Sequence, residues 1–338
     1  MKLTWATRTL ETRWAWRIAR GAFSQIEYTY LTLEHDGITG RGEAAHNSRY
    51  DESLESIQTF IELARPLLET CDPGHYAPLI DQIHQLAPGQ HAAKAALDIA
   101  LLDWVGQRLG IPLYQLWGLD PANTPLTSFS LGIDEEAILV KKLAEAEAYP
   151  ILKVKLGSPD DDAIIRTVRK HTDKPLRIDA NEGWTDRELA LDRIAMLSEA
   201  NVEFVEQPMP SKCLDDVRWL RKRAALPLVA DEDVTHANDL AALATAYDGV
   251  NLKVMKVGGL QATLQMIHTA RSLGLKIMLG CMIESSLGIT AAAHLAPLVD
   301  WADLDGSLLL RDDPFSGVQF EGGQMQLPDR PGLGVSQA

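Results

Sequence analysis

The chain has 338 residues, of which 46% are hydrophobic and 23% charged, so it is long enough for one large soluble domain and a smaller one. Its formal net charge of −15 and pI near 5.0 argue against a nucleic-acid partner or an anionic membrane surface, because both would repel it. The three cysteines are far apart, no long apolar run is present, and the N-terminus lacks a signal-peptide core. These features predict a cytoplasmic protein and leave a homo-oligomer open.

The first part of the chain predicts an α+β unit. Residues 27–34 are rich in β-branched and aromatic side chains, Asp36 and Gly37 form a turn signal, and 38–43 would be the return strand. Residues 22–26 are expected to form a loop. Helical patterns follow at 51–70, 75–86 and 90–109. We expect residues 1–120 to form a capping domain, completed by the tail at 315–338.

From about residue 124 the pattern changes to strand then helix, with helices such as 160–170, 186–198 and 260–273. Such alternation predicts a parallel sheet, and eight strands favour a closed, modified TIM (β/α) barrel over residues 121–314. A doubly wound open sheet is the alternative, although no Gly-x-Gly-x-x-Gly turn follows any strand. The strand candidates are 126–132, 152–156, 176–180, 202–206, 228–231, 250–254, 277–280 and 301–304.

Acidic residues stand at the ends of three consecutive predicted strands: Asp179, Glu206 and Asp231. Parallel barrel strands deliver their carboxyl ends to one rim, so the three carboxylates would meet there. Any one of them could instead cap a helix or pair with a surface cation. Together, without His or Cys nearby, they predict a site for Mg²⁺, with Mn²⁺ as an alternative.

Lysines stand on the two strands that flank these acids. Lys153 and Lys155 share one face of the preceding strand, because side chains alternate along a strand, and Lys253 ends the following strand with Asn251 on the same face. A pair of solvated surface lysines is the alternative. Lysines on opposite sides of a metal-bound substrate suggest that one removes an α-proton and the other returns a proton, which gives epimerisation. Lys256 is expected to be a loop or helix-start residue.

Two further groups suggest how a substrate would be held. Asp303 and Asp305 share one face of the last predicted strand and would bind a cation such as an ammonium group, although Asp before Gly306 is also a common turn. Arg20 precedes the predicted loop and could bind a distal carboxylate through two parallel hydrogen bonds. The segments 20–26 and 45–50 are expected to form a lid.

These residues resemble the enolase superfamily, specifically its muconate-lactonizing-enzyme subgroup and, within it, the dipeptide epimerases typified by L-Ala-D/L-Glu epimerase. The resemblance covers essentially the whole chain. Its motifs are Lys153-x-Lys155, Asp179-x-Asn181, Glu206-Gln-Pro208, Asp231-Glu232, Asn251-x-Lys253 and Asp303-x-Asp305. Enzymes of this superfamily combine a Lys or His base with Mg²⁺.

The resemblance implies that Asp179, Glu206 and Asp231 bind Mg²⁺ and that Lys155 and Lys253 are the acid/base catalysts. It further implies a dipeptide substrate, epimerised at the C-terminal residue, with L-Ala-D/L-Glu leading. The implied substrate-binding residues are Lys153, Asn181, Glu284, Asp303, Asp305 and Arg20. The alternatives are an N-acyl amino acid racemase, an o-succinylbenzoate synthase, a cycloisomerase, or a catalytically silent binding protein on the same fold.

Overall fold

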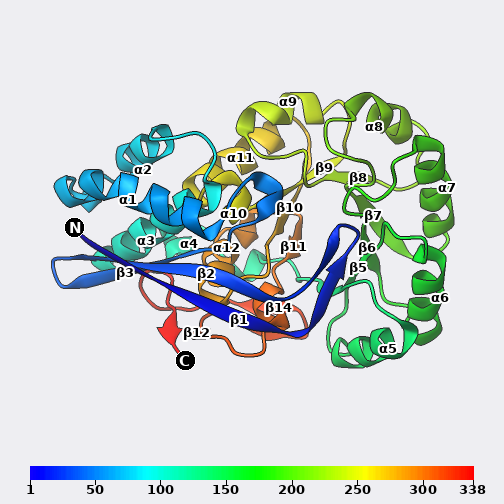
Figure 1. Cartoon of the computed structure of the whole chain (residues 1–338), viewed down its shortest axis with the longest axis horizontal. Helices are drawn as coiled ribbons and strands as arrows, with labels where there is room; N and C mark the ends of the chain where they lie inside the picture. Colours follow the sequence, from blue (N-terminus) through cyan, green and yellow to red (C-terminus); the bar gives the residue numbers. More distant parts are fainter.

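The computed structural model describes residues 1–338 and begins with a three-stranded antiparallel sheet covered by helices (Figure 1). Ala-rich α3 lies directly on this sheet. A Cβ on Gly40 or Gly42 would lie only 2.0 or 1.9 Å from the carbonyl oxygens of Ala100 and Ala96, so only glycine permits this approach. The elements are β1 (Lys2–Ile18), β2 (Gly21–His35), β3 (Ile38–Ala44), α1 (Leu54–Thr70), α2 (Tyr76–Gln85) and α3 (His91–Leu109).

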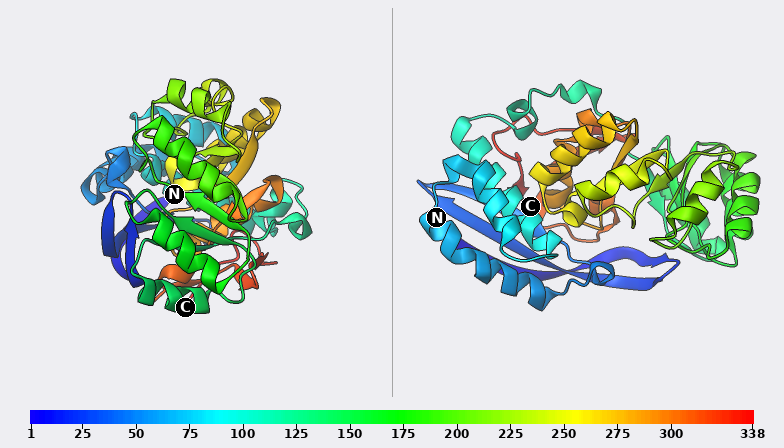
Figure 2. Two further views of the ribbon diagram at one scale, coloured as in Figure 1. Left: turned by 90° about the vertical axis from the view of Figure 1, so that its right-hand side faces the viewer. Right: turned by 90° about the horizontal axis from the view of Figure 1, so that it is seen from above.

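The hairpin of β1 and β2 is longer than the sequence predicts. Its far end leaves the helices and reaches the barrel, as the right-hand view of Figure 2 shows. Residues 22–26, expected to be a loop, are part of β2, where Ala22 pairs with Arg17 and Phe23 with Trp16. That prediction is wrong, because cross-strand pairing decides the conformation of this exposed segment. Only residues 19 and 20 remain as the turn.

Eight parallel strands follow in sequential order and close into a barrel. A bridge between Thr127 and Ala302 joins the first strand to the last. The predicted barrel is therefore confirmed, and the open sheet is wrong. The strands are β4 (Phe129–Leu131), β5 (Leu152–Lys155), β6 (Leu176–Asp179), β7 (Val202–Glu206), β8 (Leu228–Ala230), β9 (Gly249–Lys253), β10 (Lys276–Gly280) and β11 (Trp301–Asp303).

Helices connect the strands on the outside of the barrel, and the predicted ones at 160–170, 186–198 and 260–273 are confirmed within about one residue. After β11 a short 3-10 turn, Gly306–Leu309, takes the place of an outer helix before the chain continues into the tail. None of the helices combines the length and the hydropathy that a membrane-spanning segment requires. The remaining helices are α4 (Leu113–Leu116), α5 (Glu136–Glu145), α6 (Asp161–His171), α7 (Arg187–Ser198), α8 (Leu214–Arg221), α9 (Leu240–Leu243), α10 (Val254–Val257), α11 (Leu260–Ser272) and α12 (Ser286–Ala293).

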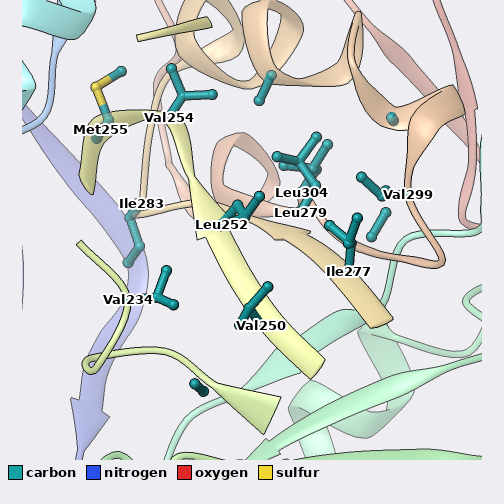
Figure 3. Close-up of a cluster of buried hydrophobic side chains, with 14 of the residues drawn as sticks. Val234, Val250, Leu252, Val254, Met255, Ile277, Leu279, Ile283, Val299 and Leu304 are labelled. Carbon is teal, nitrogen blue, oxygen red and sulfur yellow. The ribbon is translucent and has the colours of Figure 1, made fainter. Parts of the chain in front are cut away.

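The two faces of each barrel strand have different chemistry. Outward-facing side chains such as Val250 and Leu252 of β9, with Ile277 and Leu279 of β10, join the main apolar core beneath the helices (Figure 3). Inside the barrel, Phe204, Val229 and Met278 form a separate buried apolar cluster. The inward positions nearer the carboxyl ends of the strands are charged, so the apolar cluster forms the floor under a polar site.

The C-terminal tail returns to the N-terminal unit. The amide of Leu333 donates to Asp103 of α3 at 2.8 Å, and the amide of Leu113 donates to the carbonyl of Gly332 at 3.1 Å. The ring of Phe315 lies 5.1 Å from that of Tyr30 on β2. The tail therefore ties the sheet to the barrel. Its strands are β12 (Phe315–Ser316), β13 (Gln319–Glu321), β14 (Gln324–Gln326) and β15 (Ser336–Gln337).

Candidate active site

Three buried acids meet at the carboxyl ends of neighbouring strands. Asp179 ends β6, Glu206 ends β7, and Asp231 follows β8. Each offers a carboxylate oxygen within 4.8 Å of the others, and none is more than 1% exposed. The strand register explains the convergence, because Asp179 pairs directly with Glu206. The structure thus brings together the three residues that the sequence predicts as a cluster.

These acids fit a hard divalent cation. All the donors are carboxylate oxygens, which suits Mg²⁺ or Mn²⁺ better than zinc. Burial and then the charge of Asp179 raise the pKa of Glu206 to about 8, so three ionised acids are costly here without positive charge. Glu206 Oε2 is buried, and the ammonium of Lys153 at 2.6 Å is its ion-pair partner. A divalent cation between the acids would add the further positive charge that three ionised carboxylates need.

Two lysines face the acids from opposite sides of the barrel. Lys155 is on β5 and Lys253 on β9, which are four positions apart in an eight-stranded barrel. The Nζ of Lys155 lies 2.6 Å from Asp179 Oδ2, and that of Lys253 lies 2.7 Å from Asp231 Oδ2. Both side chains line the main cavity. Burial lowers the pKa of Lys253, but the carboxylates of Asp231 and Glu206 outweigh it and raise the pKa overall.

Lys153 lies below this level and does not line the cavity. Its Nζ lies 2.6 Å from Glu206 Oε2, 2.7 Å from Asp303 Oδ2 and 3.3 Å from Asp179 Oδ2. Burial alone would lower its pKa, but Asp303 and Glu206 outweigh that effect and raise it. Lys153 therefore remains a cation that links acids from both sides of the barrel, and a direct contact with substrate stays a prediction.

Lys256 is a site residue that sequence reasoning missed. It lies in α10, as a helix-start residue should, but its ammonium turns back into the barrel and is completely buried. It donates to Asp231 Oδ1 at 2.6 Å, to the carbonyl of Asn251 at 3.0 Å and to the carbonyl of Asp231. No signal in the sequence pointed to it, because the direction of its side chain depends on a short helix, α10, that begins directly after β9.

The acid pair predicted on the last strand is buried and faces the cavity. Asp303 accepts hydrogen bonds from Lys153 and from Ser128 Oγ at 2.6 Å. Burial would raise the pKa of Asp303, but the ammonium of Lys153 holds it at about 2. Asp305 accepts from the amide of Ser130 at 2.6 Å and has no cationic partner. Burial and the charge of Asp303 raise the pKa of Asp305 to about 7. Asp305 is therefore the member of the pair that lacks a cationic partner.

Arg20 and Asn181 also reach the cavity. The Nη1 atom of Arg20 lies 2.6 Å from Glu232 Oε1 and 3.1 Å from Glu182 Oε2. The amide of Asn181 donates to Glu232 at 3.4 Å, while its oxygen is buried without a partner. Arg20 thus stands where a distal carboxylate could meet it, with part of its charge already balanced by protein acids.

Glu284 lies beside the site rather than in the cavity lining. Its Oε1 accepts from the amide of Met282 at 2.8 Å, and its Oε2 is buried without a hydrogen bond. Burial raises its pKa to about 7. Its neighbour Glu43, on β3, accepts from the amide of Ser285 at 3.0 Å and joins the barrel loop to the N-terminal sheet. A substrate contact for Glu284 stays a prediction.

The cavity above these residues has a volume of about 470 Å³, within the usual range for small-molecule sites. The barrel supplies its charged wall. The N-terminal unit supplies the opposite wall through the end of the β1 and β2 hairpin and through residues 45–53, including Tyr50. Tyr50 lines the same cavity as Lys253 and Asp231, and burial together with the charge of Asp231 raises the pKa of its phenol.

Comparison with known proteins gives matches along the whole chain. A profile described as "Mandelate racemase / muconate lactonizing enzyme, N-terminal domain" matches residues 4–118, and one described as "Enolase C-terminal domain-like" matches residues 135–337. An L-Ala-D/L-Glu epimerase from Bacteroides thetaiotaomicron is 41% identical over 336 residues, covering 99% of this chain and 88% of that protein.

Solved structures agree with these matches. A dipeptide epimerase from Enterococcus faecalis, complexed with Mg and the dipeptide L-Leu-L-Tyr, is 31% identical, with a TM-score of 0.91 over 99% of both chains. An N-succinyl Arg/Lys racemase from Bacillus cereus is 28% identical, with a TM-score of 0.93 over 100% of this chain and 96% of that one.

Proposed function

The chain belongs to the mandelate racemase and muconate lactonizing enzyme family, and on that basis we propose that it is a Mg²⁺-dependent dipeptide epimerase. The reaction would invert the α-carbon of the C-terminal residue. The proposal fits the relatives, which include an L-Ala-D/L-Glu epimerase and a dipeptide epimerase complexed with Mg and a dipeptide.

The arrangement of charges around the barrel carries the proposal. β7, which ends at Glu206, and β11, which ends at Asp303 just before Asp305, are four positions apart, so the metal-binding acids and the acid pair stand on opposite walls. Lys155 and Lys253 occupy the two strands midway between them. A dipeptide has a carboxylate at one end and an ammonium at the other. Laid across the barrel, it would place its C-terminal α-carbon between the two lysines.

We infer that Asp179, Glu206 and Asp231 hold the Mg²⁺ ion. When bound, the ion would supply positive charge for the substrate carboxylate as negative charge gathers there during loss of the α-proton. Asp179 and Asp231 contact Lys155 and Lys253 at 2.6 and 2.7 Å, so the acids that would hold the ion also orient the two lysines.

The proton transfer needs one neutral lysine and one ammonium. Neutral Lys155 takes the α-proton from one face, the C–H electron pair moves into the substrate carboxylate, and the ammonium of Lys253 returns a proton to the α-carbon from the other face. The product is the epimer, with Lys155 charged and Lys253 neutral. For the opposite epimer the two lysines exchange roles. Proton exchange with water resets the site.

L-Ala-D/L-Glu is the leading substrate. Arg20 supports it, because it is a cavity cation without a part in the proton transfer and could bind a glutamate side chain, and so does the 41% identical relative. The rival activity is racemisation of an N-acylated amino acid, favoured by the similarity to the N-succinyl Arg/Lys racemase. Such a substrate has no α-ammonium, so Asp305 would then have no cation to bind.

The test is incubation of the Mg²⁺-loaded protein with dipeptide and N-acyl amino acid libraries in D₂O, read by mass spectrometry and chiral chromatography. We expect deuterium at the α-carbon of the C-terminal residue of dipeptides, L-Ala-L-Glu among them, together with its epimer. Exchange confined to N-acyl amino acids would overturn the proposal in favour of the racemase. No exchange in either library would favour a silent binding protein.

We also propose that the enzyme works in the cytoplasm and that the boundaries between its two domains lie near residues 120 and 314. The three cysteines are free thiols, which suits a reducing compartment. A separate apolar cluster of 18 residues beneath the N-terminal sheet supports an independent capping domain.

A further inference from the structure

Two segments of the N-terminal unit cover the cavity, and both are attached to the same barrel residue. One is the end of the β1 and β2 hairpin with Arg20, and the other is residues 45–53 with Arg49 and Tyr50. The barrel residue is Glu182, in the loop between β6 and α7. Glu182 had no role in the sequence predictions.

Arg49 binds Glu182 through a double contact. Its Nε donates to Glu182 Oε2 at 3.0 Å and its Nη2 to Oε1 at 2.8 Å, which is the strong, two-pronged geometry of an arginine and a carboxylate. The same Nη2 donates to Ser211 Oγ at 2.7 Å, in the loop after β7. The side chain of Arg49 is 36% exposed and that of Glu182 is 11% exposed. The pair is therefore shielded on the Glu182 side.

Arg20 reaches Glu182 from the other segment. Its Nη1 donates to Glu182 Oε2 at 3.1 Å and to the carbonyl of Asn181 at 3.0 Å. The carboxylate of Glu182 thus accepts from two arginines that are far apart in the sequence and belong to separate segments of the lid. Arg20 has a second carboxylate partner, Glu232, whereas the ion pair of Arg49 is with Glu182. The position of Arg49 therefore depends more on Glu182 than the position of Arg20 does.

Glu182 itself is held rigidly. Its φ of 67° and that of Asn181, 44°, are in the left-handed region that side chains other than glycine seldom adopt. The next residue, Gly183, packs so closely on Gly157 that a Cβ would lie 2.4 Å from the Gly157 Cα. The amide of Glu182 donates to the carbonyl of Gln207 at 3.0 Å. The barrel therefore presents a fixed carboxylate to the two arginines of the covering segments.

We infer that Glu182 is a positioning residue that fastens the segment 45–53 over the active site and so keeps Tyr50 in the wall of the cavity that Lys253 and Asp231 also line. The inference rests on the proposed function for its catalytic consequence only. Glu182 does not line the cavity, so it acts through Arg49. Without it, water reaches the reacting atoms and the substrate is held less firmly.

The test compares Glu182→Gln, Arg49→Gln and the double variant with the wild-type protein, all as full chains with Mg²⁺. Hydrogen–deuterium exchange of the peptide covering 45–53 reads the fastening without any substrate. Epimerisation of L-Ala-L-Glu gives kcat and KM. The matched control is Arg187→Gln, which removes another arginine–carboxylate pair, with Asp216 at 3.0 Å, from the outside of the barrel.

We expect each single variant to exchange about tenfold faster at 45–53 and to have about tenfold lower kcat/KM. A change of this size corresponds to the loss of one hydrogen bond between charged groups. The double variant should match Glu182→Gln, because the contact between Glu182 and Arg49 is already lost in that single variant. The control should leave both readouts unchanged. Unchanged exchange in Glu182→Gln would overturn the inference. Faster exchange in a protein that epimerises no dipeptide would keep the inference and overturn the proposed function.

Discussion

Replacing Asp305 by asparagine removes one negative charge from the cavity wall that faces the metal-binding acids and keeps the shape of the side chain. The oxygen of the new side-chain amide can still accept from the backbone amide of Ser130, which lies 2.6 Å from the present carboxylate. What is lost is the partner for a substrate ammonium. A hydrogen bond to a charged group contributes about 1.5–3 kcal/mol, so we expect kcat/KM for L-Ala-L-Glu to fall about 10- to 100-fold.

The assay follows epimerisation of L-Ala-L-Glu and of N-acetyl-L-Ala-L-Glu by chiral chromatography. The acetylated substrate has no ammonium, so the wild-type enzyme should process it poorly and Asp305→Asn should not lower its kcat/KM further. Asp305 rather than Asp303 is the informative position, because Asp303 is already paired with Lys153 at 2.7 Å. Equal losses for both substrates, or no loss for either, would refute the role of Asp305.

Three further predictions concern stability and the metal. Lys256→Met removes the buried ammonium that binds two backbone carbonyls and the carboxylate of Asp231. The free energy of unfolding should therefore fall by about 3 kcal/mol in urea titrations with EDTA. A loss below about 1 kcal/mol would contradict this prediction. Chelation should lower Tm and abolish activity. Mg²⁺ at about 100 times its Kd should restore roughly 2.7 kcal/mol of the free energy of unfolding in the wild-type protein but not in Asp179→Asn. An equal response of the two proteins would refute the metal site. The pKa of Glu284 is raised to about 7 in the folded protein. Between about pH 4.5 and 7 its carboxyl therefore ionises in the unfolded chain but stays protonated in the native state, so the native state loses stability as pH rises. Glu284→Gln should therefore gain free energy of unfolding over the wild type across that window, by up to about 3 kcal/mol in urea titrations, whereas a pH-independent difference would contradict the account.

The barrel and its ring of charges could be predicted because they follow from local rules. A strand has period two and a parallel barrel has one functional rim, so Asp179, Glu206 and Asp231 had to converge once the strands were identified. The same rules put Lys155 and Lys253 on opposite walls. No long-range information was needed.

Other features depend on how distant segments meet. The strand at 22–26 exists because it pairs with β1, and its exposed side chains show no alternation. Glu182 serves two arginines only because its loop takes an unusual backbone conformation beside Gly157. Lys256 turns inward because a short helix directly follows β9. None of these contacts leaves a periodic signal in the sequence.

The central claim is that Lys155 and Lys253 act on opposite faces of one α-carbon, and single variants in D₂O test it most directly. Lys253→Met should exchange the α-proton of only one epimer of the C-terminal residue, without inversion, and Lys155→Met should exchange only that of the other epimer. Circular dichroism and Mg²⁺-dependent Tm would verify that both variants are folded. Epimerisation by either variant, or exchange of both epimers by one of them, would contradict the two-lysine mechanism.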